Sequence, residues 1–278
     1  MRLDNMESNT LSVKSRILYQ STACIAVNKL KGEAVEGTKY KYGVKLCRSN
    51  KSHSVTPVNA AVCDKNKAVY SRRQRTLDGM ADLPGELSAV LGANVELIEA
   101  VHRLDVPVTG CVLFALTKSA LSFLNAAFVE RSVLSSSVEK IYWAVIEKPF
   151  RPLPESGELV HWIETVSGKN KSFAHNKEGS AGKKASLRYR ITGEGRNYLF
   201  VEVRLLSGRH HQIRAQFAAE GLHIKGDLKY GATRSEKGGG IRLHARSLSF
   251  PDPLNRSGII SVTAAPPETD NLWEGFLK

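Results

Sequence analysis

From residue 82 onward the chain is a succession of short apolar segments of strand length, and several follow one another with only a turn between them. Helical periodicity is confined to a few places. Consecutive strands without intervening helices are typical of antiparallel or mixed sheets. The sequence therefore predicts an α+β domain on a large, mainly antiparallel mixed sheet with flanking helices, not a doubly wound parallel one. The predicted strands cover residues 24–29, 95–101, 110–115, 139–147, 159–164, 185–191, 199–206, 242–250 and 259–264.

Two longer helices and one loop complete this prediction. Residues 119–133 carry Leu121, Leu124 and Phe128 at spacings that form one apolar stripe of a helix. Residues 209–220 form a second helix that stops at Gly221, a typical position for a helix C-terminus. The stretch 173–184 is polar and contains glycine, which favours a loop. With 278 residues, we expect a tail over 1–16 and one domain over 17–278, with no room for an N-terminal S4-type domain.

The charge of the chain indicates its class of partner. The formal net charge is +13 and the isoelectric point is about 9.6, and proteins this basic most often bind nucleic acid. Ten Lys and Arg residues against one acid lie in the irregular segment 38–75, which we interpret as an insertion that follows phosphates. The alternative is a solvated loop. The four cysteines match no zinc module, no apolar run reaches membrane-span length, and no signal peptide is present, so we expect a cytoplasmic protein without membrane contact.

One carboxylate has a suggestive position. Asp105 ends the tetrapeptide His102-Arg103-Leu104-Asp105 between two apolar strand-like runs. An Asp on a tight connection between buried strands can be held rigid and partly desolvated, with its charge balanced by a cation. Those are the conditions for a carboxylate nucleophile or base. Arg103 is the cation nearest in sequence.

A second polar segment, Arg209-His210-His211-Gln212-Ile213-Arg214, lies on the predicted helix. It could be a basic helix end laid against phosphates, or Arg214 could point inward to pair with a buried acid. A zinc site from His210 and His211 is the weakest interpretation, because adjacent histidines diverge on a helix and no further ligand lies at the right spacing.

A lysine and a tyrosine share one face of the strand 140–145. Alternation places Lys140, Tyr142 and Ala144 on one side and Trp143 on the other. Such a face could stack a base and hold its phosphate, whereas the simpler interpretation is a core strand with a half-exposed tyrosine. Phosphate loops, dinucleotide fingerprints and nucleophile elbows are absent from the sequence, so nucleotide hydrolysis, dinucleotide redox and esterase chemistry have no support.

Taken together and in this order, these segments resemble the RluA-type pseudouridine synthase family from about residue 17 to 262. The segments are Asn28-Lys29-Leu30-Lys31-Gly32, His102-Arg103-Leu104-Asp105 with Gly110, Lys140-Ile141-Tyr142-Trp143-Ala144, Ser207-Gly208-Arg209-His210-His211-Gln212-Ile213-Arg214, Gly226-Asp227 with Tyr230-Gly231, and Leu243-His244-Ala245. The resemblance implies the pseudouridine synthase fold with a central catalytic cleft. It also implies an RNA-modifying isomerase that needs no cofactor and no metal.

The resemblance also implies roles for single residues. Asp105 would be the catalytic nucleophile, Tyr142 would stack on the flipped uracil and act on it late in the reaction, and Arg214 would keep Asp105 ionised and oriented. Arg103 would contact RNA instead of serving Asp105. The reaction breaks the N1–C1′ bond of a uridine, turns the uracil and rejoins it through C5. The further residues expected at the substrate are His102, Lys140, Arg209, His211, Gln212, Asn28 and Lys29.

Four positions differ from the family pattern: Val108-Thr109 replaces Thr-Ser, Leu30 replaces proline, and His210 replaces threonine. None removes a reactive group, although the packing of the Asp105 loop depends on them. We expect a monomer that acts on ribosomal or transfer RNA. The alternatives are a non-catalytic RNA-binding or ribosome-assembly protein on the same fold, and a glycoside hydrolase that uses Asp105 with a second acid such as Asp227.

Overall fold

The computed structural model describes residues 12–36, 82–92, 95–129, 138–166, 168–178, 182–267 and 270–276. The predicted basic insertion at 38–75 lies outside these ranges, so it stays a prediction. The strands are β1 (Ile17–Gln20), β2 (Cys24–Lys29), β3 (Glu99–Ala100), β4 (Thr109–Ala115), β5 (Glu139–Glu147), β6 (Ser156–Val166), β7 (Lys171–His175), β8 (Lys183–Glu194), β9 (Tyr198–Leu205), β10 (Leu243–Pro251) and β11 (Ile259–Thr263). The helices are α1 (Leu83–Leu91), α2 (Lys118–Phe128), α3 (Gln212–Ala219) and α4 (Asn271–Glu274), with 3₁₀ turns η1 (Val13–Arg16) and η4 (Leu228–Tyr230).

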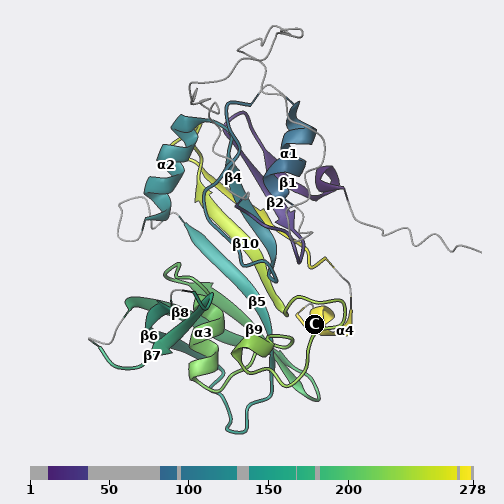
Figure 1. Ribbon diagram of the computed structural model, residues 1–278, viewed down its shortest axis with the longest axis vertical. Helices are drawn as coiled ribbons and strands as arrows, with labels where there is room; N and C mark the ends of the chain where they lie inside the picture. The colour runs from purple at the N-terminus through teal and green to yellow at the C-terminus, as the bar shows by residue number, and fades with distance from the viewer. Residues whose placement is uncertain are drawn as a thin grey trace, which may run out of the picture.

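The described strands form one mixed sheet, as the apolar segments predicted. Its order is β1-β2-β4-β10-β5-β9-β8-β6-β7, with β11 paired to β10 and β3 paired to β4. All these pairings are antiparallel except that of β4 with β10. Strands β10 and β5 run through the middle and join a half that carries α1 and α2 to a half that carries α3 (Figure 1). The prediction of a mainly antiparallel mixed sheet with flanking helices is confirmed.

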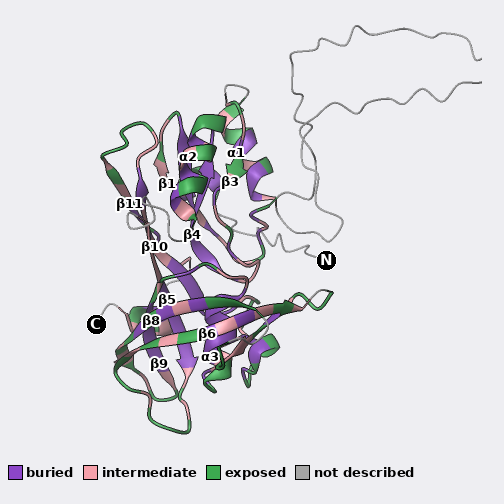
Figure 2. Ribbon diagram, turned by 90° about the vertical axis from the view of Figure 1, so that its left-hand side faces the viewer, coloured by how far each residue is buried: buried purple, intermediate pink, exposed green. Residues whose placement is uncertain are grey.

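Apolar side chains cover one face across most of this sheet and the other face at β2, β4 and β10. The larger cluster includes Val27, Phe114, Tyr142, Val203 and Ile213, so it runs continuously from β2 to α3. A second cluster lies on the other face of β2 and β4 against α2. The middle strands are therefore buried along much of their length (Figure 2). A rigid, double-sided sheet of this kind can fix residues from distant segments relative to one another.

A glycine is required where β4 and β10 meet in parallel. Gly110 has φ 112°, and a Cβ on it would lie 2.2 Å from the carbonyl oxygen of Ala245. The left-handed conformation and the contact with backbone both exclude a side chain here. This close approach fixes the strand that follows the Asp105 loop against β10, which in turn pairs with the strand of Tyr142.

Several predicted boundaries differ from the structure. Helix α2 ends at Phe128 rather than 133, and α3 begins at Gln212 rather than 209. The predicted loop 173–184 is too long, because Lys171–His175 forms β7 on β6 and β8 begins at Lys183. Polar side chains on an edge hairpin hide the alternation that would reveal a strand. The expected domain start at residue 17 is late, because Val13 and Arg16 are already buried in the domain.

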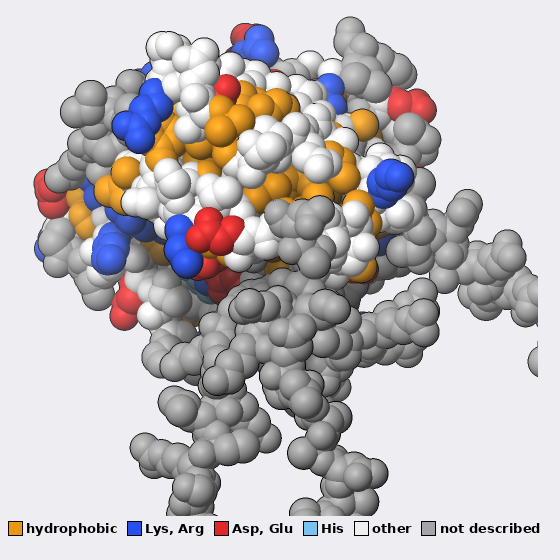
Figure 3. Space-filling model, turned by 90° about the horizontal axis from the view of Figure 1, so that it is seen from above, with side chains coloured by type: hydrophobic (Ala, Val, Ile, Leu, Met, Phe, Trp, Pro, Cys, Tyr) orange, Lys and Arg blue, Asp and Glu red, His pale blue; other side chains and the backbone are white. Residues whose placement is uncertain are grey.

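Hydrophobic side chains gather on the end of the molecule that lies uppermost in Figure 1. Seen from above, they form a patch with Lys and Arg scattered around it (Figure 3). On the described part of this face, positive charge is therefore not concentrated as it would be on a surface that binds nucleic acid chiefly through phosphates.

Candidate active site

The loop that carries Asp105 is held in place through its backbone carbonyls. Lys29 Nζ donates to the carbonyls of Val106 at 3.0 Å and Val108 at 2.7 Å, and the backbone N–H of Gly32 donates to Val106 O at 2.9 Å. Within the loop, Val108 N–H donates to Asp105 O at 3.0 Å. The end of β2 therefore clamps the turn, and the Asp105 side chain is held on a short, rigid connection.

Arg214 joins Asp105 to a second acid. Its Nη1 donates to Asp105 Oδ2 at 2.9 Å, while Nε and Nη2 donate to the two carboxylate oxygens of Asp227 at 2.6 and 2.8 Å. The exposed fractions of the side chains are 5% for Arg214, 1% for Asp227 and 15% for Asp105. Burial opposes the charge of Arg214, but the hydrogen bonds and charges of Asp227 and Asp105 raise its pKa. The prediction that Arg214 points inward to a buried acid is therefore correct.

Asp227 is a functional residue whose role the sequence did not reveal. Its bidentate contact fixes the guanidinium plane of Arg214 and so fixes the direction of the bond to Asp105. Because Asp227 is buried and bound on both oxygens, it cannot act as the second acid of a glycoside hydrolase. The Gly226-Asp227 motif drew attention to this residue, but its distance from Arg214 in the sequence did not indicate that the two side chains pair.

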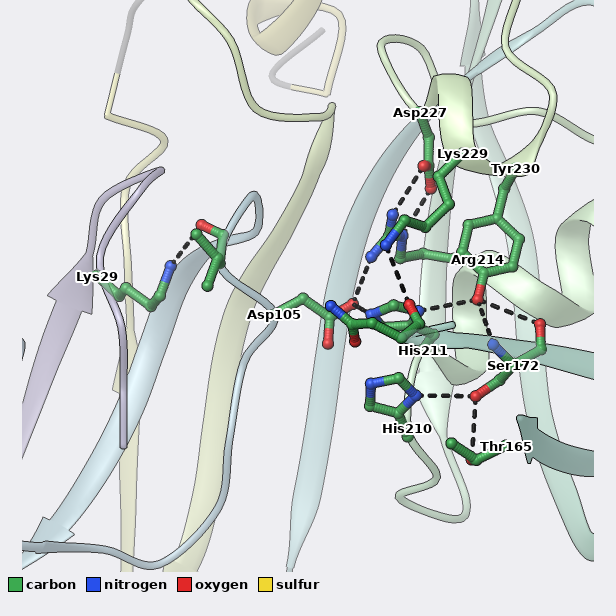
Figure 4. A network of polar contacts seen from close by, with 12 residues as sticks. Lys29, Asp105, Thr165, Ser172, His210, His211, Arg214, Asp227, Lys229 and Tyr230 are labelled. Carbon is green, nitrogen blue, oxygen red and sulfur yellow. Dashed lines mark hydrogen bonds and ion pairs between the residues drawn. The ribbon is translucent and has the colours of Figure 1, made fainter. Parts of the chain in front are cut away.

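The start of α3 arranges the histidines. His211 precedes the helix in the left-handed conformation at φ 54°, and its O accepts from Ala215 N at 2.9 Å. The Gln212 amide holds the preceding turn: Oε1 accepts from Ser207 Oγ at 2.8 Å and from Arg209 N at 3.0 Å. This turn directs His211 toward Asp105, with Nε2 3.5 Å from Oδ2 (Figure 4).

Asp105, His210 and His211 line a cavity of about 590 Å³. Asp105 and Tyr142 lie on its wall, between the half of the sheet that carries α2 and the half that carries α3. The cavity is large enough for a nucleoside and combines apolar walls with a few polar groups. Its rim is basic. The residues around it include Glu36, His102, Arg103, Asp105, Phe128, Lys140, Tyr142, Leu205, Arg209, His210 and His211.

Tyr142 presents an uncharged ring to this cavity. It is almost fully buried on β5, and burial first, then the charge of Asp105, raises the pKa of its phenol. A neutral aromatic ring on the wall beside a carboxylate is suited to stacking a base. The predicted alternation is confirmed, with Tyr142 and Ala144 in the larger apolar cluster and Trp143 on the opposite face.

The structure separates the expected substrate residues into two groups. His102, Arg103, Lys140, Arg209 and His211 line the cavity. The other three do not line it, and their contacts within the fold give no support to the prediction that they contact RNA. Lys29 is 0% exposed and binds three carbonyls of its own fold. Asn28 donates to Ala265 O and buries its Oδ1. Gln212 binds the turn through Oε1 and donates from Nε2 to Ser186 O on β8.

The two residues after the Asp105 turn that differ from the family pattern, Val108 and Thr109, pack into the core. Val108 is buried in the larger apolar cluster. Thr109 Oγ1 lies 2.8 Å from His244 Nδ1, and His244 Nε2 lies 3.1 Å from the carbonyl of Ala264. The loop is therefore tied to β10 by a buried polar chain, and its geometry does not depend on the Thr-Ser pair of the family pattern.

Two histidines, the buried His244 and the half-buried His102, are expected to make the stability of the protein sensitive to acid. Burial, aided by the charge of Lys140, lowers the pKa of His102 to about 3, and burial lowers that of His244 to about 4. Below pH 6.5 these two histidines take up protons in the unfolded chain, whereas in the folded protein their rings stay neutral. Stability present above pH 6.5 is therefore lost as the pH falls toward 4. Between pH 7 and pH 5 we expect a loss of about 2 kcal/mol for each ring.

Urea unfolding of the wild type and of His102→Gln at pH 7 and pH 5 measures this effect. Glutamine can still accept from Leu113 N, as His102 Nε2 does at 3.3 Å, but it takes up no proton. The variant should lose about 2 kcal/mol less than the wild type over this range. The same change at His175 on β7, whose side chain is 39% exposed, controls for the loss of a histidine. An equal pH dependence in wild type and His102→Gln would contradict the assignment.

Comparison with known proteins decides the family. A family model described as RNA pseudouridylate synthase matches residues 23–219, well over half of the chain. The chain belongs to this family. The match spans Asp105, Tyr142 and Arg214, and it confirms the RluA-type resemblance that the motifs indicated.

Relatives within the family are distant. An uncharacterized RNA pseudouridine synthase of Mycobacterium bovis is 34% identical over 175 residues, which are 60% of this chain and 52% of that protein. An uncharacterized RNA pseudouridine synthase of Zymomonas mobilis is 30% identical over 62% of this chain and 76% of its own length. The ribosomal large subunit pseudouridine synthase C of Vibrio parahaemolyticus is 26% identical over 61% of this chain and 52% of its own length. The match thus spans about half the length of the first and third relatives.

Solved structures agree on the fold. The human RNA pseudouridylate synthase domain containing 4 superposes with a TM-score of 0.62 at 19% identity, over 95% of this chain and 94% of that one. The human domain containing 1 protein gives 0.58 at 21% identity, over 90% and 83%. The predicted pseudouridine synthase fold is confirmed by this likeness.

The described residues form neither a metal site nor a membrane-spanning helix. Among the described residues, no group of three or more His, Cys, Asp and Glu side chains is placed to hold a metal ion. The rings of His210 and His211 stack at 3.8 Å, and their Nδ1 atoms lie against Ser172 and Tyr230. Within the same residues, no helix combines the length and apolar character that crossing a bilayer requires.

Proposed function

We propose that this protein is an RNA pseudouridine synthase that isomerises uridine in structured RNA, with Asp105 as the nucleophile. The observation that carries the proposal is the Arg214 bridge, which aims a single carboxylate at a nucleoside-sized cavity beside Tyr142. Membership of the RNA pseudouridylate synthase family supports the same reaction.

The reaction needs a carboxylate and a place for the base to turn. An oxygen of Asp105 forms a bond to C1′ while the C1′–N1 bond breaks, and the electron pair leaves with N1 of the uracil. The freed uracil turns and forms a bond from C5 to C1′, and the electron pair of the ester bond returns to Asp105. The proton on C5 is then lost and N1 gains one, so atoms balance. Tyr142 stacks on the uracil and assists this last step.

The uridine must leave its stack to reach Asp105. Arg103, Lys140 and Arg209 lie around the cavity, where they can hold the phosphates that flank an extruded nucleotide. Arg103 is exposed and pairs with Glu36 at 3.4 Å, not with Asp105. We therefore keep Arg103 as a contact to RNA, with His102 and His211 as groups that face the nucleoside.

The choice of RNA is part of the proposal. We propose ribosomal or transfer RNA as substrate and a monomer acting in the cytoplasm. The high positive charge of the chain supports an RNA substrate. The two described cysteines, Cys24 and Cys111, are buried free thiols, as expected in a reducing compartment.

Unmodified transcripts test the activity and the substrate together. The full chain is incubated with ribosomal RNA transcripts and, separately, with a pool of transfer RNA transcripts, and pseudouridine is mapped by selective chemical labelling and reverse transcription. We expect conversion at a small number of uridines in one of the two classes. Tight binding to both classes with no conversion would favour the alternative, a non-catalytic RNA-binding protein on this fold.

A further inference from the structure

Among the described residues, Asp105 has two polar neighbours on one carboxylate oxygen, Oδ2. Oδ2 accepts from Arg214 Nη1 at 2.9 Å and lies 3.5 Å from His211 Nε2. No described residue makes a hydrogen bond or ion pair with Oδ1. If both neighbours donate to Oδ2, the carboxylate cannot rotate without losing two contacts, and Oδ1 is left to face the substrate.

Whether His211 donates depends on which ring nitrogen carries the proton. Burial, followed by the charge of Arg214, lowers the pKa of His211 to about 3, so the ring is neutral and carries one N–H. Its Nδ1 lies 2.8 Å from the hydroxyl of Tyr230. The partner of one nitrogen thus sets the state of the other.

Of the two acceptors within reach of the Tyr230 hydroxyl proton, His211 Nδ1 is the nearer. The hydroxyl accepts from the backbone N–H of Ser172 at 2.9 Å, and its own proton can go to His211 Nδ1 at 2.8 Å or to Ser172 O at 3.2 Å. The shorter contact is the stronger one. Nδ1 then accepts, and the ring proton sits on Nε2, facing Asp105. The opposite tautomer would set the Nε2 lone pair against the carboxylate.

We propose that Tyr230 and His211 form a positioning pair for Asp105, in which Tyr230 fixes the His211 tautomer and His211 Nε2–H holds Oδ2 so that Oδ1 serves as the nucleophile. This proposal rests on the pseudouridine synthase activity proposed above. The contact of 3.5 Å is long for a hydrogen bond, and such catalytic contacts commonly shorten when the reacting complex forms.

Buried neighbours keep the pair in place (Figure 4). Ser172 on β7 is 1% exposed, and its Oγ lies 2.9 Å from His210 Nδ1 and 3.1 Å from Thr165 Oγ1. The His210 ring stacks on His211 at 3.8 Å, and the Tyr230 ring meets His211 edge-on. His210, which replaces the usual threonine of the family pattern, therefore fixes the plane of the His211 ring in this chain.

Side-chain NMR tests the tautomer without any need for activity. In the ¹⁵N-labelled full chain, His211 should show a protonated Nε2 and an unprotonated Nδ1. Tyr230→Phe removes the donor and should shift the ring toward a mixture of both forms. A proton on Nδ1 in the wild type would overturn the proposal, whatever reaction the protein catalyses.

Two amide substitutions test the function of the pair. In His211→Gln the amide nitrogen reaches the position of Nε2, whereas in His211→Asn it reaches only that of Nδ1. With the RNA that the wild type converts, we expect the single-turnover rate to fall about 100-fold in His211→Asn and about tenfold in His211→Gln. RNA affinity should stay within about twofold of the wild type in both.

A double variant separates this role from simple packing. In the wild-type background, Tyr230→Phe should lower the single-turnover rate about tenfold. In the His211→Gln background it should lower the rate no further, because an amide has no tautomer to be set. Tyr189→Phe, a buried tyrosine of β8 outside the site, is the matched control and should change the rate less than twofold. Equal costs of Tyr230→Phe in both backgrounds, or equal rates of the two amide variants, would refute the pair. Failure of the wild type to form pseudouridine would refute the proposed function instead, and the NMR result would still decide the tautomer.

Discussion

Asp105→Asn is expected to abolish pseudouridine formation and to leave RNA binding nearly unchanged. The amide has the shape of the carboxylate, and its oxygen can still accept from Arg214, but it cannot attack C1′. Arg214 keeps its two contacts to Asp227, so the variant should fold normally. We expect the single-turnover rate to fall by more than about 10⁴-fold, as for loss of other nucleophiles. The rate is measured on the RNA that the wild type converts, and binding is measured on the same RNA.

Asp252→Asn is the matched control for this prediction. Asp252 lies in the turn between β10 and β11, where its Oδ1 accepts from Leu254 N at 2.8 Å, a contact that asparagine retains. Both rate and affinity should equal those of the wild type. Turnover by Asp105→Asn above a hundredth of the wild-type rate would exclude Asp105 as nucleophile.

Arg214→Ala is expected to cause the largest loss of stability of any single charge removal in the site. The substitution leaves Asp227, which is 1% exposed, and Asp105 close together without their shared cation. Removing one partner from a buried ion pair typically costs about 3–5 kcal/mol. The free energy of unfolding, measured with urea at pH 7, should fall by about this amount, and any folded fraction should be inactive.

Arg188→Ala provides the comparison. Arg188 Nε binds Glu158 at 3.0 Å, but the arginine side chain is 62% exposed, so this pair should contribute less than about 1 kcal/mol. Arg214→Lys restores the charge without the bidentate geometry and should be intermediate in stability. Equal losses in Arg214→Ala and Arg188→Ala would mean that the bridge between the two acids does not stabilise the fold.

The sequence was most informative where chemistry and periodicity coincide. Asp105, Tyr142 and Arg214 could be placed in one site because the order of their motifs resembles the RluA-type family. Local structure alone gave a turn between strands, a strand face and a helix. The mixed sheet followed from strands that succeed one another without helices. Alternation alone placed Tyr142 and Trp143 on opposite faces of β5.

The remainder depends on contacts between segments distant in sequence. Lys29 was expected at RNA because its segment resembles a motif of the family, but three carbonyls of the Asp105 loop and of Leu30 bind it internally. Burial lowers its pKa to about 8, against the opposing charges of Glu33 and Asp105. Asp227 meets Arg214 only because η4 packs beside α3. Ser172 lies on β7, a strand whose polar sequence gave no sign of it.

Pseudouridine mapping in cells tests the central claim most directly. Pseudouridine maps are compared between source cells with the gene and cells from which it is deleted. Two further deletion lines express the wild type or Asp105→Asn at equal levels. We predict that one or a few pseudouridines in ribosomal or transfer RNA disappear on deletion, return with the wild type and stay absent with Asp105→Asn. Restoration of those sites by Asp105→Asn, or an unchanged map after deletion, would contradict the claim that Asp105, held by Arg214, is the nucleophile of an RNA pseudouridine synthase.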